Sequence, residues 1–207
     1  MAAISLPAIG YLDPVFVDMM EDLKSLLRYV FQTKNALTFP ISGPGSVGME
    51  YCFVNLVAPG DKVIVCRNGV FGGRMIENVE RCGGVPVVVE DGWGEQISPQ
   101  KLDDALKANS DVRLVAFVHA ETSTGVQSDA TTLVEIAHRH DALTIVDAVT
   151  SLAGTPCWLT NGNLTRFIRQ ARSACRAHRA CHRSHSASAW STMSRRARTR
   201  YTAGSWT

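Results

Sequence analysis

Four short runs of apolar, mostly β-branched residues alternate with stretches whose apolar side chains repeat at helical spacing. The runs cover residues 62–66 (KVIVC), 85–90 (VPVVVE), 113–120 (RLVAFVHA) and 143–149 (LTIVDAV). The helical stretches cover residues 13–32, 72–82, 98–108 and 128–140. Strands that are apolar throughout and alternate with helices are typical of a mainly parallel sheet flanked by helices. The sequence therefore predicts an α/β fold.

The charged residues divide the chain of 207 residues into two parts. All 19 Asp and Glu precede residue 160, whereas ten of the 21 Lys and Arg follow it, and each of those ten is an arginine. Residues 1–158 therefore have the composition of an ordinary globular domain. Residues 159–207 are rich in Arg, Ser and Ala and have little apolar periodicity, so we expect an arginine-rich, disordered tail.

The six cysteines form no CxxC pair and have no spacing typical of metal ligands. Apolar neighbours around Cys52, Cys66 and Cys82 indicate buried thiols in a reducing compartment. The N-terminus has no charged segment followed by a long apolar run, and no apolar run approaches the length of a membrane span. We therefore expect a cytoplasmic protein with no metal site and no membrane contact.

Glycine-rich or polar stretches lie at or just after the ends of predicted strands, where parallel sheets bind their ligands. They are SGPGSVG (42–48), RNGVFGGR (67–74), HAETSTG (119–125) and VDAVTS (146–151). Because the carboxyl ends of parallel strands meet at one edge of the sheet, we expect these stretches to lie close together. The sequence therefore predicts a ligand site at that edge.

The first stretch has the spacing G-x-G-x-x-G and precedes the apolar segment MEYCFVNLV (49–57), which we predict to be helical. Backbone N–H groups at the start of such a helix bind phosphate, and the hydroxyl of Ser46 adds a further donor. A dinucleotide site would also need an acid after the next strand, but Asp61 precedes that strand. Arg67 would suit the 2′-phosphate of NADP. A glycine-rich turn without a ligand is an equally good interpretation.

Two of the other stretches contain groups suited to a flat heterocyclic ring. Phe71 lies between glycines in a predicted loop, where its ring would stack on a heterocycle or fill a gap against the core. Asp147 ends an otherwise apolar strand, where an unpaired carboxylate is costly. A protonated pyridine nitrogen would stabilise that carboxylate. The alternative is a carboxylate that caps a neighbouring helix.

Taken together, the four stretches resemble the class V aminotransferases that use pyridoxal 5′-phosphate, in particular the alanine–glyoxylate and serine–glyoxylate group. The resemblance extends from GYLDPVF (10–16) to GTP (154–156). It implies that residues 1–158 are an incomplete cofactor-binding large domain of fold-type I pyridoxal phosphate enzymes, without their C-terminal small domain. It also implies a homodimer in the intact family.

The resemblance further implies a role for individual residues. Gly45 and Ser46 bind the phosphate, and Phe71 stacks on the ring. Thr122 or Ser123 donates a hydrogen bond to the ring hydroxyl. Asp147 pairs with the pyridinium nitrogen, and Val149 packs against the ring. In much of the family the stacking residue is Trp and the position of Ser46 is His or Thr, so this chain departs from the pattern at both.

The family's catalytic lysine, to which the cofactor is bound covalently, has no counterpart, because no lysine follows Lys107. Read one nucleotide out of frame, residues 163–169 permit L-D-A-I-Y-S and residues 171–176 permit Q-K-C-L-S, which is the family's lysine segment. We therefore infer a frameshift near residues 157–159, with residues 159–207 out of frame. No catalytic residue is predicted in the chain as written.

The predicted function is transamination between a small amino acid, alanine or serine, and glyoxylate or a similar 2-oxo acid, in a chain that is inactive without its lysine. A cysteine desulfurase, which usually has an Asn-containing loop at the position of HAETSTG, is a second possibility within the same fold. An NADP-dependent oxidoreductase that uses GPGSVG is a third. A noncatalytic fragment whose basic tail binds nucleic acid nonspecifically is a fourth. We expect no specific nucleic-acid partner.

Overall fold

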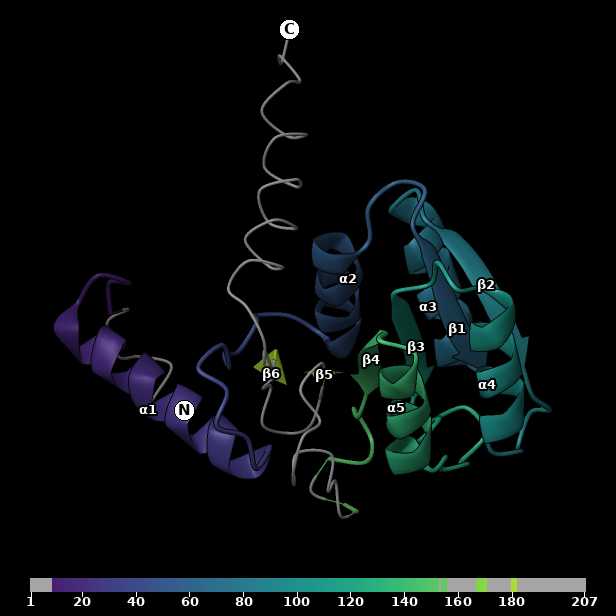
Figure 1. The fold of residues 1–207 in the computed structure, drawn as a ribbon. Helices are drawn as coiled ribbons and strands as arrows, with labels where there is room; N and C mark the ends of the chain where they lie inside the picture. Colours follow the sequence, from purple (N-terminus) through teal and green to yellow (C-terminus); the bar gives the residue numbers. More distant parts are fainter. Residues whose placement is uncertain (1–8, 153, 156–166, 171–179, 182–207) are drawn as a thin grey trace, which may run out of the picture.

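The computed structural model describes residues 9–152, 154–155, 167–170 and 180–181. Its helices are α1 (Pro14–Val30), α2 (Gly45–Leu56), α3 (Val70–Arg81), α4 (Pro99–Ala108) and α5 (Ala130–Arg139). Its strands are β1 (Lys62–Arg67), β2 (Val85–Glu90), β3 (Leu114–Val118), β4 (Leu143–Asp147), β5 (Phe167–Gln170) and β6 (Ala180–Cys181). Figure 1 shows these elements along the chain.

The strands form one sheet in the order β2-β1-β3-β4-β5-β6. The pairs from β2 to β5 are parallel, and only β6 is antiparallel to its neighbour. The mainly parallel α/β fold predicted from the apolar runs is therefore confirmed. The chain reverses its direction of winding between β1 and β3, and such a switch point is where open α/β sheets bind ligands.

Helices cover both faces of the sheet, and the side chains of each strand alternate between the two faces. Val63 and Val65 of β1 pack in the same core cluster as Phe53 of α2 and Met75 of α3. The residue between them, Ile64, packs in a second cluster with residues of α4 and α5. Both faces of the central strands β1, β3 and β4 are thus buried, which explains why these strands are apolar throughout rather than alternating. Figure 1 shows α4 and α5 over one face of the strands.

Local sequence sets the start of three helices. Asp13 precedes Pro14, and its carboxylate accepts a hydrogen bond from the backbone N–H of Val15 at 2.9 Å. Ser98 caps α4 by accepting from the N–H of Lys101. The Asp129 carboxylate caps α5 in the same way. Such caps satisfy N–H groups that have no partner within the helix.

Helix α3 begins at Val70, two residues before the predicted start, so Phe71 lies in its first turn and not in a loop. The N-cap residue, Gly69, has no side chain with which to cap the helix. A carboxylate from a distant loop, that of Glu121, accepts hydrogen bonds from the first-turn N–H groups instead. The expectation that Phe71 lies in a loop was wrong because this cap is supplied from outside the local sequence.

Helix α1 stands apart from the sheet (Figure 1). Its C-terminal end is anchored by a small cluster in which Leu27 and Phe31 are buried and Leu23 and Leu152 are partly buried. Much of the rest of the helix exposes large apolar side chains, including Val15, Val17, Met19, Leu26 and Tyr29. None of the helices that the structure describes is both long enough and apolar enough to cross a lipid bilayer.

Strands β5 and β6 come from the segment 159–207, which was predicted to be an arginine-rich disordered tail. Backbone pairing joins β5 to β4 from Thr144↔Phe167 to Asp147↔Gln170. The other residues of this segment lie outside the described residues. The reading frame and the disorder of the tail therefore remain predictions.

Candidate cofactor site

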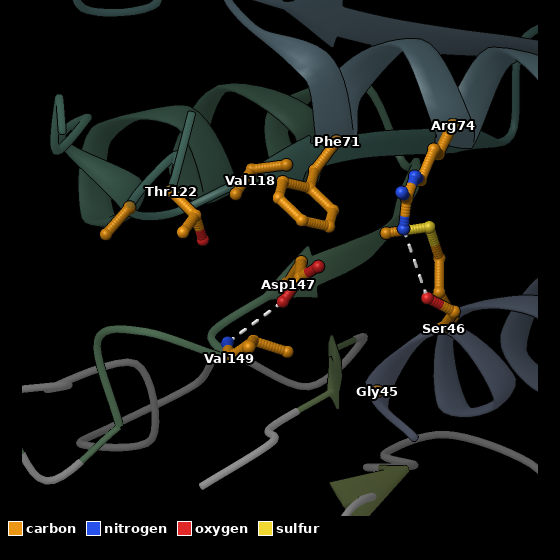
Figure 2. Close-up of a pocket in the computed structure, with 10 residues that line it drawn as sticks. Gly45, Ser46, Phe71, Arg74, Val118, Thr122, Asp147 and Val149 are labelled. Carbon is orange, nitrogen blue, oxygen red and sulfur yellow. Dashed lines mark hydrogen bonds between the residues drawn. The ribbon is translucent and has the colours of Figure 1, made fainter. Parts of the chain in front are cut away.

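A cavity of about 250 Å³ opens at the carboxyl ends of β1, β3 and β4. Its lining comes from α2, from the first turns of α3 and from the ends of and loops after β3 and β4 (Figure 2). The lining residues are Gly45, Ser46, Met49, Phe71, Arg74, Val118, Ala120, Thr122, Asp147 and Val149. Six of the seven residues that the sequence indicated are therefore brought together, and the seventh, Ser123, is not among them.

Asp147 supplies a carboxylate at the end of β4. Its side chain lines the cavity although the residue is only 3% exposed. One carboxylate oxygen, Oδ1, accepts a hydrogen bond from the backbone N–H of Val149 at 2.9 Å (Figure 2). That bond helps to orient the carboxylate within the cavity. A buried carboxylate of this kind is suited to a cationic or N–H-bearing group of a ligand.

The opposite part of the cavity is formed by the N-terminus of α2. Gly45 and Ser46 are the first two residues of that helix, and the N-cap residue, Pro44, has no side-chain acceptor with which to cap it. The positive end of a helix dipole and its N–H groups favour an anion. The guanidinium of Arg74 donates a hydrogen bond through Nη1 to Oγ of Ser46 at 3.3 Å. This part of the cavity is therefore electropositive.

Phe71 lines the wall between these two groups. The guanidinium of Arg74 lies over the Phe71 ring, with Cζ 4.9 Å from the ring centroid. Figure 2 shows the ring extending from α3 toward the end of β4, with Val118 on one side and Arg74 on the other. An aromatic face in this position is suited to stacking on a flat heterocycle.

The loop after β3 provides Thr122 to the cavity but uses Ser123 elsewhere. The Ser123 hydroxyl donates a hydrogen bond to Glu121 Oε1 at 2.7 Å and accepts one from the backbone N–H of Val70 at 3.0 Å. The bond from Val70 holds the start of α3 against this loop. Of the two residues suggested for the ring hydroxyl, Thr122 is the one that lines the cavity.

Sequence reasoning missed Arg74, together with the apolar lining residues Met49, Val118 and Ala120. The signal for Arg74 was present, because it follows Phe71 by three residues. On a helix, residues at this spacing lie on the same face. The relationship was hidden because α3 was expected to begin only after Phe71.

Arg67, the residue suggested for a 2′-phosphate, does not line the cavity. Its guanidinium forms an ion pair with Glu90 of the neighbouring strand β2. Because Arg67 is already paired with a residue of β2, it gives no support to an NADP site beside GPGSVG. The oxidoreductase alternative therefore has no structural support.

The fold and the site define a class of enzyme. The family model for class-V aminotransferases matches residues 11–161, and the chain belongs to this family. Class-V aminotransferases are enzymes that depend on pyridoxal 5′-phosphate. The family assignment made from the four sequence stretches is therefore confirmed.

The chain is similar to individual members of this family. The chain is 36% identical over 159 residues to alanine–glyoxylate aminotransferase of Mus musculus, which is 77% of this chain and 38% of the mouse protein. It is 35% identical over 151 residues to (S)-ureidoglycine–glyoxylate transaminase of Bacillus subtilis (strain 168), which is 73% of this chain and 36% of that protein. A solved alanine–glyoxylate aminotransferase from Nostoc sp. has a TM-score of 0.79 and 33% identity, covering 94% of this chain and 52% of that one. The chain thus spans well under half the length of these two curated relatives.

The lining residues fit pyridoxal 5′-phosphate in charge and in aromatic character. The cofactor has a ring nitrogen at one end and a phosphate at the other. The cavity has a buried carboxylate, Asp147, in one part, and a helix N-terminus with Arg74 in another. The aromatic side chain of Phe71 lies on the wall of the same cavity. The family's cofactor therefore suits this chain's own residues.

Proposed function

We propose that this chain is the cofactor-binding part of an aminotransferase that moves an amino group between a small amino acid, alanine or serine, and glyoxylate or a similar 2-oxo acid. One observation carries the proposal. A single cavity combines the buried carboxylate of Asp147 with the electropositive N-terminus of α2. Glyoxylate is the acceptor in the names of both curated relatives described above, whereas their amino donors differ.

Six of the lining residues have a defined task in this proposal. When bound, pyridoxal phosphate supplies an electron sink for the α-carbon of the amino acid. Asp147 keeps a proton on the ring nitrogen through a charge-assisted hydrogen bond. Gly45 and Ser46 bind the phosphate through the start of α2. Phe71 and Val149 pack against the ring, and the Thr122 hydroxyl donates to the ring oxygen.

We further propose that the chain as written does not catalyse transamination, because it lacks the catalytic lysine. None of the described residues that line the cavity is a lysine, and the sequence has no lysine after Lys107. The match to the family model ends at residue 161, close to the frameshift inferred near residues 157–159. The nucleotide sequence across codons 155–165 tests this point. If no other frame encodes the lysine segment, the frameshift is wrong.

A homodimer and a cytoplasmic location belong to the same proposal. The apolar side chains that α1 exposes, among them Leu26 at 62% and Tyr29 at 82%, form a surface suited to a second copy of the chain. Cys52 and Cys66 are buried and lie outside any disulfide among the described residues, which suits a reducing compartment. Burial, reinforced by the nearby Asp91 carboxylate, raises the pKa of the Cys66 thiol well above its usual range. Cys66 is therefore a structural residue and not a nucleophile.

Binding of pyridoxamine 5′-phosphate to the full chain, measured by calorimetry, tests the function. We expect saturable binding that Asp147→Asn weakens about tenfold or more, because the substitution removes the charge opposite the ring nitrogen. Asp104→Asn, an exposed change on α4, should bind as the wild type does. NADPH, titrated in parallel, should not compete. Absence of pyridoxamine phosphate binding, or displacement by NADPH, would contradict the proposal.

A further inference from the structure

Arg74 connects two parts of the cavity that belong to different helices. It lies on α3 and donates to the Ser46 hydroxyl on α2 at 3.3 Å. The same guanidinium lies over the ring of Phe71, with Cζ 4.9 Å from the centroid. Figure 2 shows Arg74 and Ser46 extending toward one another across the edge of the cavity. One cation thus touches both the group at the phosphate end and the aromatic wall.

The charge of Arg74 is not matched by a carboxylate among the residues that the structure describes. Arg67 and Arg81 each form an ion pair with a glutamate, whereas no ion pair of the described part of the chain includes Arg74. Its hydrogen-bond partner, a serine hydroxyl, is neutral. Arg74 therefore presents a positive charge to the cavity, and an anionic group of a ligand would complete its environment.

We propose that Arg74 makes this site select the phosphorylated form of the B6 vitamer. Its guanidinium binds the phosphate beside the N-terminus of α2, and its contact with Phe71 fixes the ring against which the heterocycle stacks. The inference rests on the proposed function, because it assumes that the ligand is a phosphorylated pyridine. It adds the full positive charge of Arg74 to the partial charge of the helix N-terminus and the neutral hydroxyl of Ser46.

Two properties of the guanidinium support this role over that of a simple surface charge. It is planar, so it can stack on the Phe71 ring and still direct N–H groups toward oxygen atoms. It is also fixed from two sides, which lowers the conformational cost of ordering a long side chain on binding. A lysine at this position would keep the charge but lose the stacking contact.

The test compares two ligands that differ only in the phosphate. Affinities of the full chain for pyridoxamine 5′-phosphate and for pyridoxamine are measured by calorimetry for wild type, Arg74→Met and Arg74→Lys. We expect Arg74→Met to reduce the preference for the phosphorylated ligand about tenfold, mainly by weakening its binding, while pyridoxamine binding changes little. Arg74→Lys should retain an intermediate preference.

Arg81→Met serves as the matched control. Arg81 lies in the last turn of α3 and pairs with Glu77, away from the cavity. The Arg81→Met substitution should leave the preference for pyridoxamine 5′-phosphate over pyridoxamine unchanged. A fall in affinity for both ligands by the same factor in Arg74→Met would indicate a purely structural role and overturn the inference, as would no change at all.

A second measurement covers the case in which Arg74→Met does not fold. Salt should weaken wild-type binding of pyridoxamine 5′-phosphate more steeply than that of pyridoxamine, and Arg74→Lys should keep this difference. Equal salt dependence for the two ligands would overturn the inference. If the wild type binds neither ligand, the proposed function fails too; if it binds both and only the preference is insensitive to Arg74, this inference alone fails.

Discussion

The carboxylate of Glu121 accepts a hydrogen bond from the backbone N–H of Phe71 at 3.1 Å, across a sequence separation of 50 residues. The same oxygen accepts a hydrogen bond from the N–H of Gly72 at 3.3 Å. The other oxygen accepts hydrogen bonds from the backbone N–H and the hydroxyl of Ser123. Glu121 is 1% exposed. The loop after β3 therefore caps the helix that carries the aromatic wall of the cavity.

Replacing Glu121 with alanine should destabilise the fold by about 2–3 kcal/mol, because several N–H and O–H donors lose their acceptor in a buried place. The measurement is the free energy of unfolding in urea. Glu135→Ala, an exposed change on α5, serves as control and should lie within about 0.5 kcal/mol of the wild type. Equal stabilities for the two variants would show that the cap contributes little.

Two glycines near the start of α3 should respond in opposite directions to alanine. A Cβ at Gly69 would lie 2.4 Å from Cγ of Glu121 and 2.6 Å from Oγ of Ser123, whereas a Cβ at Gly73 meets nothing within 4 Å. We expect Gly69→Ala to lower stability by about 1–3 kcal/mol through overpacking. Gly73→Ala should raise it by about 0.5–1 kcal/mol, since alanine favours the helix. Thermal or urea unfolding of both variants decides; a stable Gly69→Ala would mean that the loop after β3 moves freely.

The carboxylate of Asp103 joins α4 to the end of α5. It pairs with Lys107 at 2.6 Å and with the Nε2 atom of His140 at 3.0 Å. The hydrogen bond from Lys107, followed by that from His140, lowers the pKa of Asp103 from 3.8 to about 2. The folded state therefore binds this proton less readily than the unfolded state does.

The stability that Asp103 contributes should be fully present above its unfolded pKa and should disappear as the pH falls through about 2. The difference in unfolding free energy between wild type and Asp103→Asn is expected to shrink over this range. Lys107→Met, which removes the largest cause of the shift, should flatten the pH dependence. A difference that stays constant down to about pH 2 would contradict this account.

Borohydride reduction in the presence of pyridoxal 5′-phosphate probes the absent lysine. The five lysines of the chain precede residue 108, and the described lining of the cavity contains none of them. We expect no lysine whose labelling is prevented by excess pyridoxamine 5′-phosphate, as read from peptide masses. A single lysine protected in this way would show that another residue of the chain reaches the cofactor.

The sequence predicted the sheet because burial on both faces leaves a local signal. The apolar run at 62–66 matches β1, which is buried on both faces. The run at 85–90 matches β2, although most residues of this edge strand are exposed or only partly buried. Asp147 was found for a related reason, since a carboxylate that ends an apolar strand is conspicuous. The position of the ligand site, at the edge where the glycine-rich and polar stretches meet, followed from the parallel arrangement of the strands alone.

The remaining features depend on contacts between distant segments. The first turn of α3 was missed because its cap comes from Glu121. The use of the Ser123 hydroxyl in holding Val70 was hidden for the same reason. From the local sequence, Arg74 is simply one of the charged residues of an amphipathic helix. Its contact with Ser46 exists because the topology places α2 and α3 on the same face of the sheet.

The cap on α3 separates the positions that shape the cavity from those that touch its contents. Neither Gly69 nor Glu121 lines the cavity, yet together they set where Phe71 and Arg74 sit. A mutational screen scored by vitamer retention would therefore assign both positions to the binding surface. A stability assay run beside the screen would reveal that these two residues act by holding α3 in place and not by contacting the ligand.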